Sequence, residues 1–257
     1  MKSYRGVFLD LDGTLFKGNE VIPGAVEFVN RLEDEGIPFL YLTNNSSRTP
    51  EQVAEKLRGF GYPAEPEQVV TTALAAAAWL KEEMNSPAVY VIGEEGLIRA
   101  VEEAGCRIVD EDPEAVVVGL DRQFTYEKMK KACLAIRAGA RFIGTNADRA
   151  LPTEEGFLPG SGSLSMAIAA STGVSPFFIG KPEAVIMRYA LKTLGTKAEE
   201  TLVVGDNLDT DILAGIRGGM DTLLVLTGVS TEEDLEKTDI RPTYVVRQLA
   251  DWSLQQI

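Results

Sequence analysis

The chain has 257 residues, of which 45% are hydrophobic, and it carries a formal net charge of -14 with no histidine. This length and composition predict a globular protein with a sizeable core, arranged as one large domain or two modest ones. The acidic balance argues against a nucleic-acid partner, and the missing histidine excludes Ser-His and Cys-His nucleophiles and imidazole metal ligands.

The N-terminal segment "MKSYRGVFLDLDG" reaches acidic residues after a very short apolar run, and no run elsewhere has the length of a membrane span. We therefore expect a soluble, cytoplasmic protein without a membrane partner. Cys106 and Cys133 lie far apart without a CxxC spacing, which favours buried structural thiols over a metal or redox pair.

Short apolar runs alternate with segments of helical period in the first and last parts of the chain. The first part predicts strands over 6–12 and 38–45 and helices over 24–36 and 49–61. The last part predicts helices over 184–195 and 210–219 and strands over 201–206, 221–228 and 243–246. This alternation is typical of βαβ units with a parallel sheet, so we expect both ends to share one doubly wound α/β sheet.

The middle of the chain has a strand and helix pattern of its own. It predicts strands over 88–93, 114–120 and 141–146 and helices over 94–105, 125–139 and 164–173. Polar, proline-containing breaks near Asn85 and Ser175 are typical of hinges. We therefore predict a discontinuous core over 1–84 and 175–257 with an inserted domain over 85–174.

Polar residues follow the predicted strands at their carboxyl ends, where open parallel sheets bind ligands. Asp10 and Asp12 close the first strand, "LTNNSS" from Thr43 closes the second, Lys181 follows "FFIG", and Asp206 closes "TLVVG". Each of these positions could also be a turn, because Asp, Asn and Gly are favoured there by local hydrogen bonding.

A second group of carboxylates makes a metal site the better interpretation. Asp206 and Asp211 add acids at a second strand end, and carboxylates crowded without a counter-charge repel one another. Oxygen ligands without histidine or cysteine suit Mg²⁺. Asn207 and Asp209, in the same run, are expected to cap the following helix.

Lys181 and the "TNN" run are candidate contacts for an anion. Pro182 is predicted at the first helical position, which leaves Lys181 at a helix N-terminus, where a nearby anion would stabilise its charge. The alternative is a solvated surface lysine. Thr43, Asn44 and Asn45 form either a simple turn or an anion cradle.

Taken in order, "DLDGT", "LTNNS", "GKP" and "GDNLDTD" resemble the four motifs of the haloacid dehalogenase superfamily of phosphohydrolases. "FLDLDGTLFKGNEVIPGA", "TNNSSRTP" and "GDNLDTDILAG" are similar to the branch that contains the NagD-type nucleotidase, the para-nitrophenyl phosphatases and the pyridoxal phosphate phosphatase. The resemblance implies a Rossmann-like core with an inserted cap domain of the larger α/β type (C2).

The resemblance also implies a role for each matching residue. Asp10 would be the nucleophile that becomes an aspartyl phosphate, and Asp12 would be the general acid and base. Thr43, Asn44 and Lys181 would bind the transferring phosphoryl group, and Lys181 would also act in catalysis by neutralising charge between nucleophile and phosphate. Asp10, the backbone carbonyl of Asp12 and Asp206 would ligate Mg²⁺, with Asp211 orienting these ligands.

The function implied is Mg²⁺-dependent hydrolysis of a small phosphate monoester. The substrate would be a phosphorylated metabolite such as a sugar phosphate or nucleoside monophosphate, with para-nitrophenyl phosphate as an artificial substrate. The cap would read the leaving group, and it offers a surface for a homodimer.

Two sequence features depart from this pattern. The cap of the family often carries "TNPD", whereas this chain reads "GTNADRALP" with Ala147 in place of the proline, which puts substrate contacts there in doubt. The run "GSGS" from Gly160 precedes a predicted helix, but it lacks the Lys-Ser/Thr of a P-loop, so we interpret it as a loop and helix cap.

Two alternative functions stay open. A phosphomutase of the same superfamily would share these motifs and would need a bisphosphorylated activator. A receiver-type phosphoacceptor domain also has a phosphorylated aspartate, but it is about half as long and places the acceptor on a later strand. The DxDGT order and the inserted domain argue against a receiver.

Overall fold

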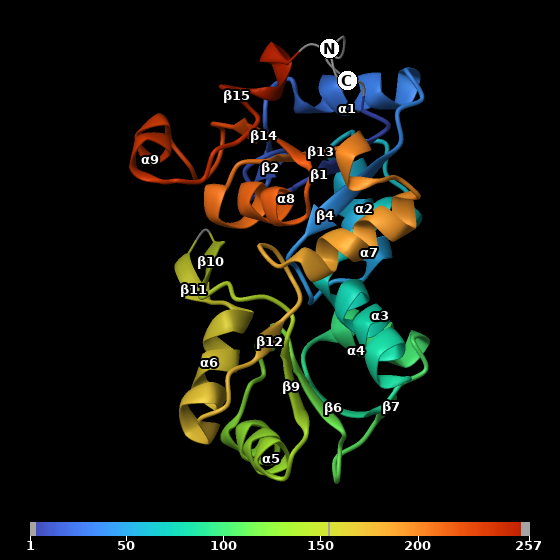
Figure 1. The fold of residues 1–257 in the computed structure, drawn as a ribbon, viewed down its shortest axis with the longest axis vertical. Coiled ribbons are helices and arrows are strands. Elements are labelled where there is room, and N and C mark those ends of the chain that lie inside the picture. The colour runs from blue at the N-terminus through green and yellow to red at the C-terminus, as the bar shows by residue number, and fades with distance from the viewer. Residues whose placement is uncertain (1–3, 154, 253–257) are drawn as a thin grey trace. The chain divides into compact units, whose positions relative to one another are not determined.

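A computed structural model of the chain describes residues 4–153 and 155–252, and the chain divides into two compact units. The first unit takes the chain up to Thr43, residues 51–70 and everything from Lys181 onward, and the second takes residues 44–50 and 71–180. The chain therefore crosses between the units four times. Figure 1 shows the elements of both units.

The first unit is built on a six-stranded sheet with the order β15-β14-β13-β1-β4-β5. Its strands are β1 (Gly6–Leu9), β4 (Phe39–Thr43), β5 (Val69–Thr71), β13 (Thr201–Gly205), β14 (Asp221–Val225) and β15 (Tyr244–Val246). β1 pairs in parallel with both β4 and β13. The order reverses between β1 and β13, and in a doubly wound sheet this reversal is where ligands bind.

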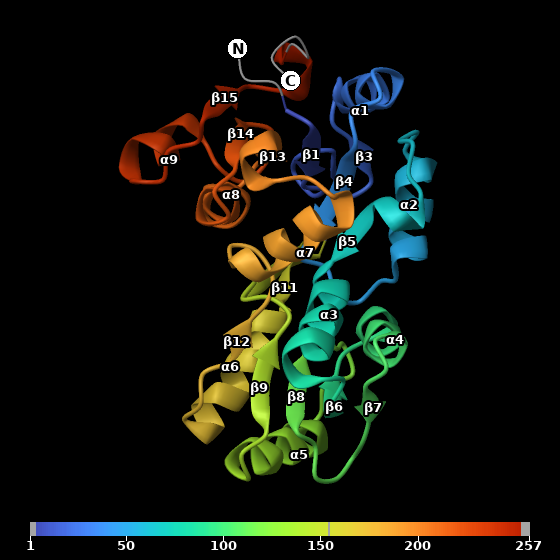
Figure 2. The ribbon, with the colours of Figure 1, turned by 45° about the vertical axis from the view of Figure 1, so that its right-hand side comes forward.

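Helices cover both faces of this sheet (Figures 1 and 2). They are α1 (Ala25–Asp34), α2 (Pro50–Gly59), α7 (Ala184–Leu194) and α8 (Leu213–Arg217). A further helix, α9 (Glu232–Lys237), lies in the connection between β14 and β15. Val7 and Leu9 of β1 share one core cluster with Phe28 of α1 and Leu57 of α2. Because alternate strand residues face opposite ways, Phe8 is buried on the α7 and α8 side. The predicted doubly wound core is confirmed.

The second unit contains a separate five-stranded parallel sheet with the order β12-β9-β8-β6-β7. Its strands are β6 (Ala88–Ile92), β7 (Arg107–Ile108), β8 (Ala115–Val118), β9 (Arg141–Gly144) and β12 (Phe177–Phe178). Helices α5 (Tyr126–Arg137) and α6 (Ser161–Thr172) pack on one face around Ile136 and Ile168. Helices α3 (Thr72–Met84) and α4 (Glu95–Glu103) lie on the other (Figure 2).

The second unit is wider than the insertion predicted over 85–174. Helix α3 belongs to it: α3 contacts α4, its residues Ala76 and Leu80 are buried, and the ring of Trp79 lies 5.1 Å from that of Phe177 in β12. The crossings therefore lie at Thr71 and Gly180, outside the proline-containing breaks, and the loop over 44–50 belongs to this unit as well.

Two short hairpins and four short helical turns complete the described elements. The hairpins pair β2 (Phe16–Lys17) with β3 (Glu20–Val21) and β10 (Ala150–Thr153) with β11 (Gly156–Pro159), and the turns cover Pro66–Gln68, Ala198–Glu200, Leu208–Ile212 and Leu249–Asp251. Cys106 and Cys133 are buried free thiols. Within residues 4–153 and 155–252, every helix is too short or too polar to cross a membrane.

Candidate active site

The backbone of β1 and β13 places two carboxylates at the point where the strand order reverses. β1 ends at Leu9, which is level with Val204, and the N–H of Asp10 donates to the carbonyl of Val204 at 2.9 Å. β13 ends at Gly205, so Asp206 follows directly. Asp10 and Asp206 therefore emerge from adjacent strands at the ligand-binding edge of the sheet.

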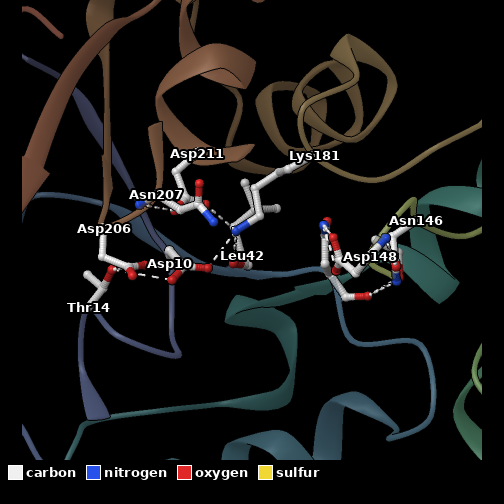
Figure 3. Close-up of polar contacts among 11 residues, drawn as sticks. Asp10, Thr14, Leu42, Asn146, Asp148, Lys181, Asp206, Asn207 and Asp211 are labelled. Atoms are coloured by element: carbon white, nitrogen blue, oxygen red, sulfur yellow. Dashed lines mark hydrogen bonds and ion pairs between the residues drawn. The ribbon is translucent and has the colours of Figure 1, made fainter. Parts of the chain in front are cut away.

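Lys181 connects two of the predicted site carboxylates (Figure 3). Its Nζ donates to Asp10 Oδ1 at 2.5 Å and to Asp211 Oδ1 at 2.6 Å, with the carbonyl of Leu42 at 3.3 Å. Only 3% of the lysine side chain is exposed. This burial excludes the solvated surface lysine that the sequence left open.

The predicted position of Lys181 at the start of a helix is wrong. Helix α7 begins at Ala184 with Glu183 as its N-cap, and the peptide between Lys181 and Pro182 is cis. Pro182 thus stands in the turn before the helix. Lys181 also follows no strand of the first sheet, because β12 pairs with β9 in the second unit. The charge of Lys181 is balanced by carboxylates and not by a helix terminus.

Two glycines let the chain approach Asp206 closely. A Cβ built on Gly13, which has φ +90°, would lie 2.3 Å from Asp206 Oδ2, and one on Gly228 would lie 1.8 Å from the same atom. The N–H of Val229 then donates to Asp206 Oδ2 at 2.6 Å. The loops that contain Gly13 and Gly228 therefore both pack against Asp206, and a residue larger than glycine does not fit at either position.

Thr14 is a site residue that sequence reasoning missed. Its fully buried hydroxyl lies 3.2 Å from Asp10 Oδ2 and 3.4 Å from Asp206 Oδ1. Its place in "DLDGT" was the available signal, although a threonine after glycine in a turn has an ordinary local explanation.

The run after Asp206 forms one wide helical turn, Leu208–Ile212, in which the N–H of Ile212 donates to the carbonyl of Asn207 five residues back. Turns of this kind often occur at functional sites. The side chain of Asn207 accepts from the N–H of Asp209 at 2.9 Å, so Asn207 is the predicted cap. The same turn directs Asp211 inward, where Oδ2 accepts from the N–H of Asn207 at 3.1 Å.

Burial and crowding perturb every titratable group of this cluster. Burial and the charges of Asp10 and Asp211 raise the pKa of Asp206 to about 8. Burial likewise raises the pKa of Asp211 to about 6 and that of Asp10 above its ordinary value, although Lys181 opposes both shifts. Burial would lower the pKa of Lys181, but Asp10 and Asp211 raise it.

The carboxylates present fit a hard divalent cation. Oxygen atoms of Asp10, Asp206 and Asp211 lie within 4.8 Å of one another, and Lys181 supplies a single positive charge to this group. Burial is the main cause of the raised pKa values of Asp206 and Asp211, and the charge of Asp10 raises both further, so a cation bound here would stabilise the ionised carboxylates. An all-oxygen donor set suits Mg²⁺ better than a softer metal.

The other two predicted residues of the first unit differ in exposure. Thr43 is the last residue of β4 and is 5% exposed, whereas Asp12 is exposed. Asp12 lies two residues beyond Asp10 in the turn that leads to β2. Its expected roles as proton carrier and carbonyl ligand stay predictions.

Asn44 and Asn45 belong to the second unit, where they have different surroundings. Asn45 Oδ1 accepts from the N–H groups of Ser47 and Arg48, which is the simple turn that the sequence allowed. Asn44 Nδ2 donates to both carboxylate oxygens of Asp148, at 3.3 and 3.2 Å. The structure therefore separates two adjacent asparagines that the sequence treated alike.

The "GSGS" run caps a helix as predicted, but it is not a loop, because α6 begins at Ser161 and Gly160 alone stands before it as the N-cap. The N–H groups of Gly160 and Gly162 donate to the carbonyls of Arg149 and Asp148, so they are already satisfied by the chain. A Cβ on Gly160 would lie 2.2 Å from the carbonyl oxygen of Asp148, and one on Gly162 would lie 2.3 Å from that of Ala147. These glycines let the segment containing Ala147 and Asp148 pack on the start of α6.

Comparisons with known proteins show which family the sequence resembles. Residues 7–107 match a family model described as haloacid dehalogenase-like hydrolase, and residues 178–252 match one described as HAD-hydrolase-like. The chain is 54% identical over 252 residues to the 5'-nucleotidase YutF of Bacillus subtilis, covering 98% of each chain. It is 51% identical to an acid sugar phosphatase of Staphylococcus aureus, covering 97% of this chain and 96% of the other.

Solved structures show the same agreement over the whole fold. NagD from E. coli K-12 superposes with a TM-score of 0.92 at 37% identity, covering 99% of this chain and all of the other. A p-nitrophenyl phosphatase from Archaeoglobus fulgidus superposes with a TM-score of 0.92 at 38% identity, with the same coverage. The resemblance read from the sequence motifs is thereby confirmed.

Proposed function

The chain is an enzyme of the haloacid dehalogenase-like hydrolase family, and on this premise we propose that it hydrolyses small phosphate monoesters with the help of Mg²⁺, through a phosphorylated Asp10. The observation that carries the proposal is the position of Lys181 between Asp10 and Asp211, 2.5 and 2.6 Å from their carboxylates, with Asp206 in the same cluster. Buried charges of both signs at a strand-order reversal suit phosphoryl transfer.

The reaction proceeds in two displacements at phosphorus. A carboxylate oxygen of Asp10 attacks the phosphorus atom, the ester P–O bond breaks, and the leaving oxygen takes a proton from the Asp12 carboxyl. Water then attacks the phosphorus and gives a proton to Asp12, while the bond between phosphorus and Asp10 breaks. Inorganic phosphate leaves and both aspartates return to their starting states.

Positive and hydrogen-bonding groups of the chain hold the transferring phosphoryl group. Lys181 places its charge against Asp10, which reduces repulsion between an anionic nucleophile and an anionic substrate. Thr43 and Asn44 supply a hydroxyl and an amide to the phosphoryl oxygens. Thr14 orients Asp10 and Asp206 relative to each other through its hydroxyl.

Asp10, Asp206 and the backbone carbonyl of Asp12 would hold the Mg²⁺ ion, and Asp211 would orient these groups. The bound ion supplies further charge neutralisation between nucleophile and phosphate. Asp211 suits the orienting role because its two oxygens are already engaged, one with Lys181 and one with the N–H of Asn207.

The substrate is a small phosphorylated metabolite, and the second unit acts as the cap that selects it. Relatives named as a 5'-nucleotidase and as acid sugar phosphatases support the nucleoside monophosphate and sugar phosphate classes. The p-nitrophenyl phosphatases among the related structures support the use of para-nitrophenyl phosphate in assays.

Turnover of a phosphate-ester panel with and without Mg²⁺ tests the proposal. The wild-type protein should release inorganic phosphate only with Mg²⁺, and Asp10→Asn should abolish this because it removes the nucleophilic charge while keeping the shape. Asp209→Asn is the matched control, since Asp209 is exposed and stands in the same run as Asp206 and Asp211. Activity that persists in Asp10→Asn or in excess EDTA would refute the proposal.

The same assay addresses the two alternatives. Hydrolysis without any bisphosphorylated activator would exclude a phosphomutase. The receiver-type alternative is no longer supported, because the family models are those of hydrolases and the 5'-nucleotidase YutF matches 98% of this chain.

A further inference from the structure

The contact between Asn44 and Asp148 joins residues 104 positions apart in the sequence. Asn44 Nδ2 lies 3.3 and 3.2 Å from the two oxygens of Asp148, and both residues belong to the second unit. Asn146, which Figure 3 shows close to Asp148, donates from its Nδ2 to the backbone carbonyl of Asn44 at 2.7 Å. Both the side chain and the backbone of Asn44 are therefore held by one segment.

The chemistry of the partners determines which way the Asn44 amide points. An ionised carboxylate only accepts hydrogen bonds, so the amide must present its NH₂ group to Asp148. The amide oxygen then lies on the other side, close to Gly180, where a Cβ would lie 2.7 Å from Asn44 Oδ1. A hydrogen bond to a charged acceptor is stronger than one to a neutral group.

Asp148 is itself held in place from two directions. Its N–H donates to Asn146 Oδ1 at 3.0 Å, and that oxygen also accepts from the hydroxyl of Ser161 at 2.6 Å. Its carbonyl accepts from the N–H of Gly162 at 2.9 Å. Asn146 and Ser161 are buried, so the hydrogen bonds that hold Asp148 are shielded from water.

We propose that Asp148 is a positioning residue for phosphoryl binding: it accepts one N–H of the Asn44 amide and so holds the second N–H of the same NH₂ group in place to donate to a phosphoryl oxygen. The inference rests on the proposed function, in which Asn44 binds the phosphoryl group. Because Asp148 acts through Asn44, its removal weakens binding of every phosphate ester and of inorganic phosphate by the same factor. A residue that read the leaving group would change these factors unequally.

A double-mutant cycle with Asn44→Ala, Asp148→Ala and the combined variant tests the inference. We expect each single variant to raise both the KM for para-nitrophenyl phosphate and an alkyl phosphate and the inhibition constant of inorganic phosphate, all by about 10-fold. The combined variant should be no weaker than Asn44→Ala alone, because residues that act through one contact are not additive. Asp148→Asn should recover most of the loss, since its amide oxygen can still accept from Asn44.

Asp110→Asn is the control for charge and folding. Asp110 is an exposed carboxylate of the same unit that pairs with Lys131, and its variant should keep wild-type constants. Additive losses, or losses that differ between the aryl ester, the alkyl ester and inorganic phosphate, would overturn the positioning role. Full activity in Asn44→Ala would instead overturn the phosphoryl-binding role of Asn44, and the inference with it, while the tests on Asp10 would stand.

Discussion

Replacing Lys181 with methionine should destabilise the protein strongly in the absence of metal. The Nζ atom joins two carboxylates whose side chains are 13% and 2% exposed, those of Asp10 and Asp211. Removing one partner of a buried ion pair leaves an uncompensated charge and costs about 3 to 5 kcal/mol. At about 2 to 4 °C per kcal/mol for a protein of this size, the midpoint of thermal unfolding should fall by about 6 to 20 °C.

The loss should depend on pH in a defined direction. Burial raises the pKa of Asp211 to about 6 even with Lys181 present, and the pKa of Asp10 is raised as well. Without the lysine both values rise further, and a protonated carboxyl needs no counter-charge. Proton binding to the folded state therefore stabilises the variant as the pH falls, so its deficit is largest near pH 8 and shrinks toward pH 5.

Thermal unfolding in EDTA at pH 8 and pH 5 measures both effects. Lys237→Met is the matched control, because Lys237 makes an ion pair of the same 2.5 Å length with Glu233 while its side chain is 67% exposed. An exposed pair of this kind is worth about 0 to 1 kcal/mol. If Lys181→Met unfolded as close to wild type as Lys237→Met at pH 8, burial would not explain the strength of the contact.

Three further substitutions test the site. Thr14→Val should lower kcat/KM by about 5- to 30-fold because it removes the hydroxyl shared by Asp10 and Asp206, and Thr14→Ser should restore it; unchanged kinetics would mean that the hydroxyl orients neither carboxylate. Gly228→Ala should raise the half-saturating Mg²⁺ concentration by about 10- to 100-fold in an activation titration, because the added Cβ would lie 1.8 Å from Asp206 Oδ2. Gly59→Ala is the control and should leave this concentration unchanged, because nothing lies within 4 Å of its added Cβ. Asp12→Ala should slow turnover by about 10² to 10⁴ and, on rapid mixing with para-nitrophenyl phosphate, should release a burst of nitrophenol near one equivalent, because the phenolate leaves without a proton but the attacking water lacks a base. An alkyl phosphate should show no burst, and equal slowing of both esters would assign the proton to another residue.

Local pattern was enough to predict the longer strands of both sheets and most of the helices. Apolar runs such as "GVFL" and "TLVVG" could only be buried strands of a parallel sheet, and helical period marked the crossovers between them. Carboxylates directly after these strands had to meet at one edge of the sheet. This is why Asp10 and Asp206 could be paired before any coordinates were known.

Contacts between distant residues could not be predicted in this way. Lys181 lies 171 positions from Asp10 and 30 from Asp211, and nothing near it in the sequence indicates two carboxylate partners. Local reasoning instead assigned Lys181 to a helix start that lies at Ala184. The glycines at 160 and 162 posed the same difficulty, because the backbone that they accommodate belongs to Ala147 and Asp148.

The loop over 44–50 is hydrogen-bonded to other segments of the second unit. The hydroxyl of Thr72 donates to the carbonyl of Asn44 at 2.8 Å, and the hydroxyl of Ser46 accepts from the N–H of Leu120 at 3.2 Å. A chimaera that exchanged only one continuous insertion with a relative would therefore part Asn44 from Asp148. A chimaera that takes its substrate selectivity from another phosphatase therefore needs two segments replaced in this chain, 44–50 and 71–180. The residue at position 44 then also comes from the other phosphatase.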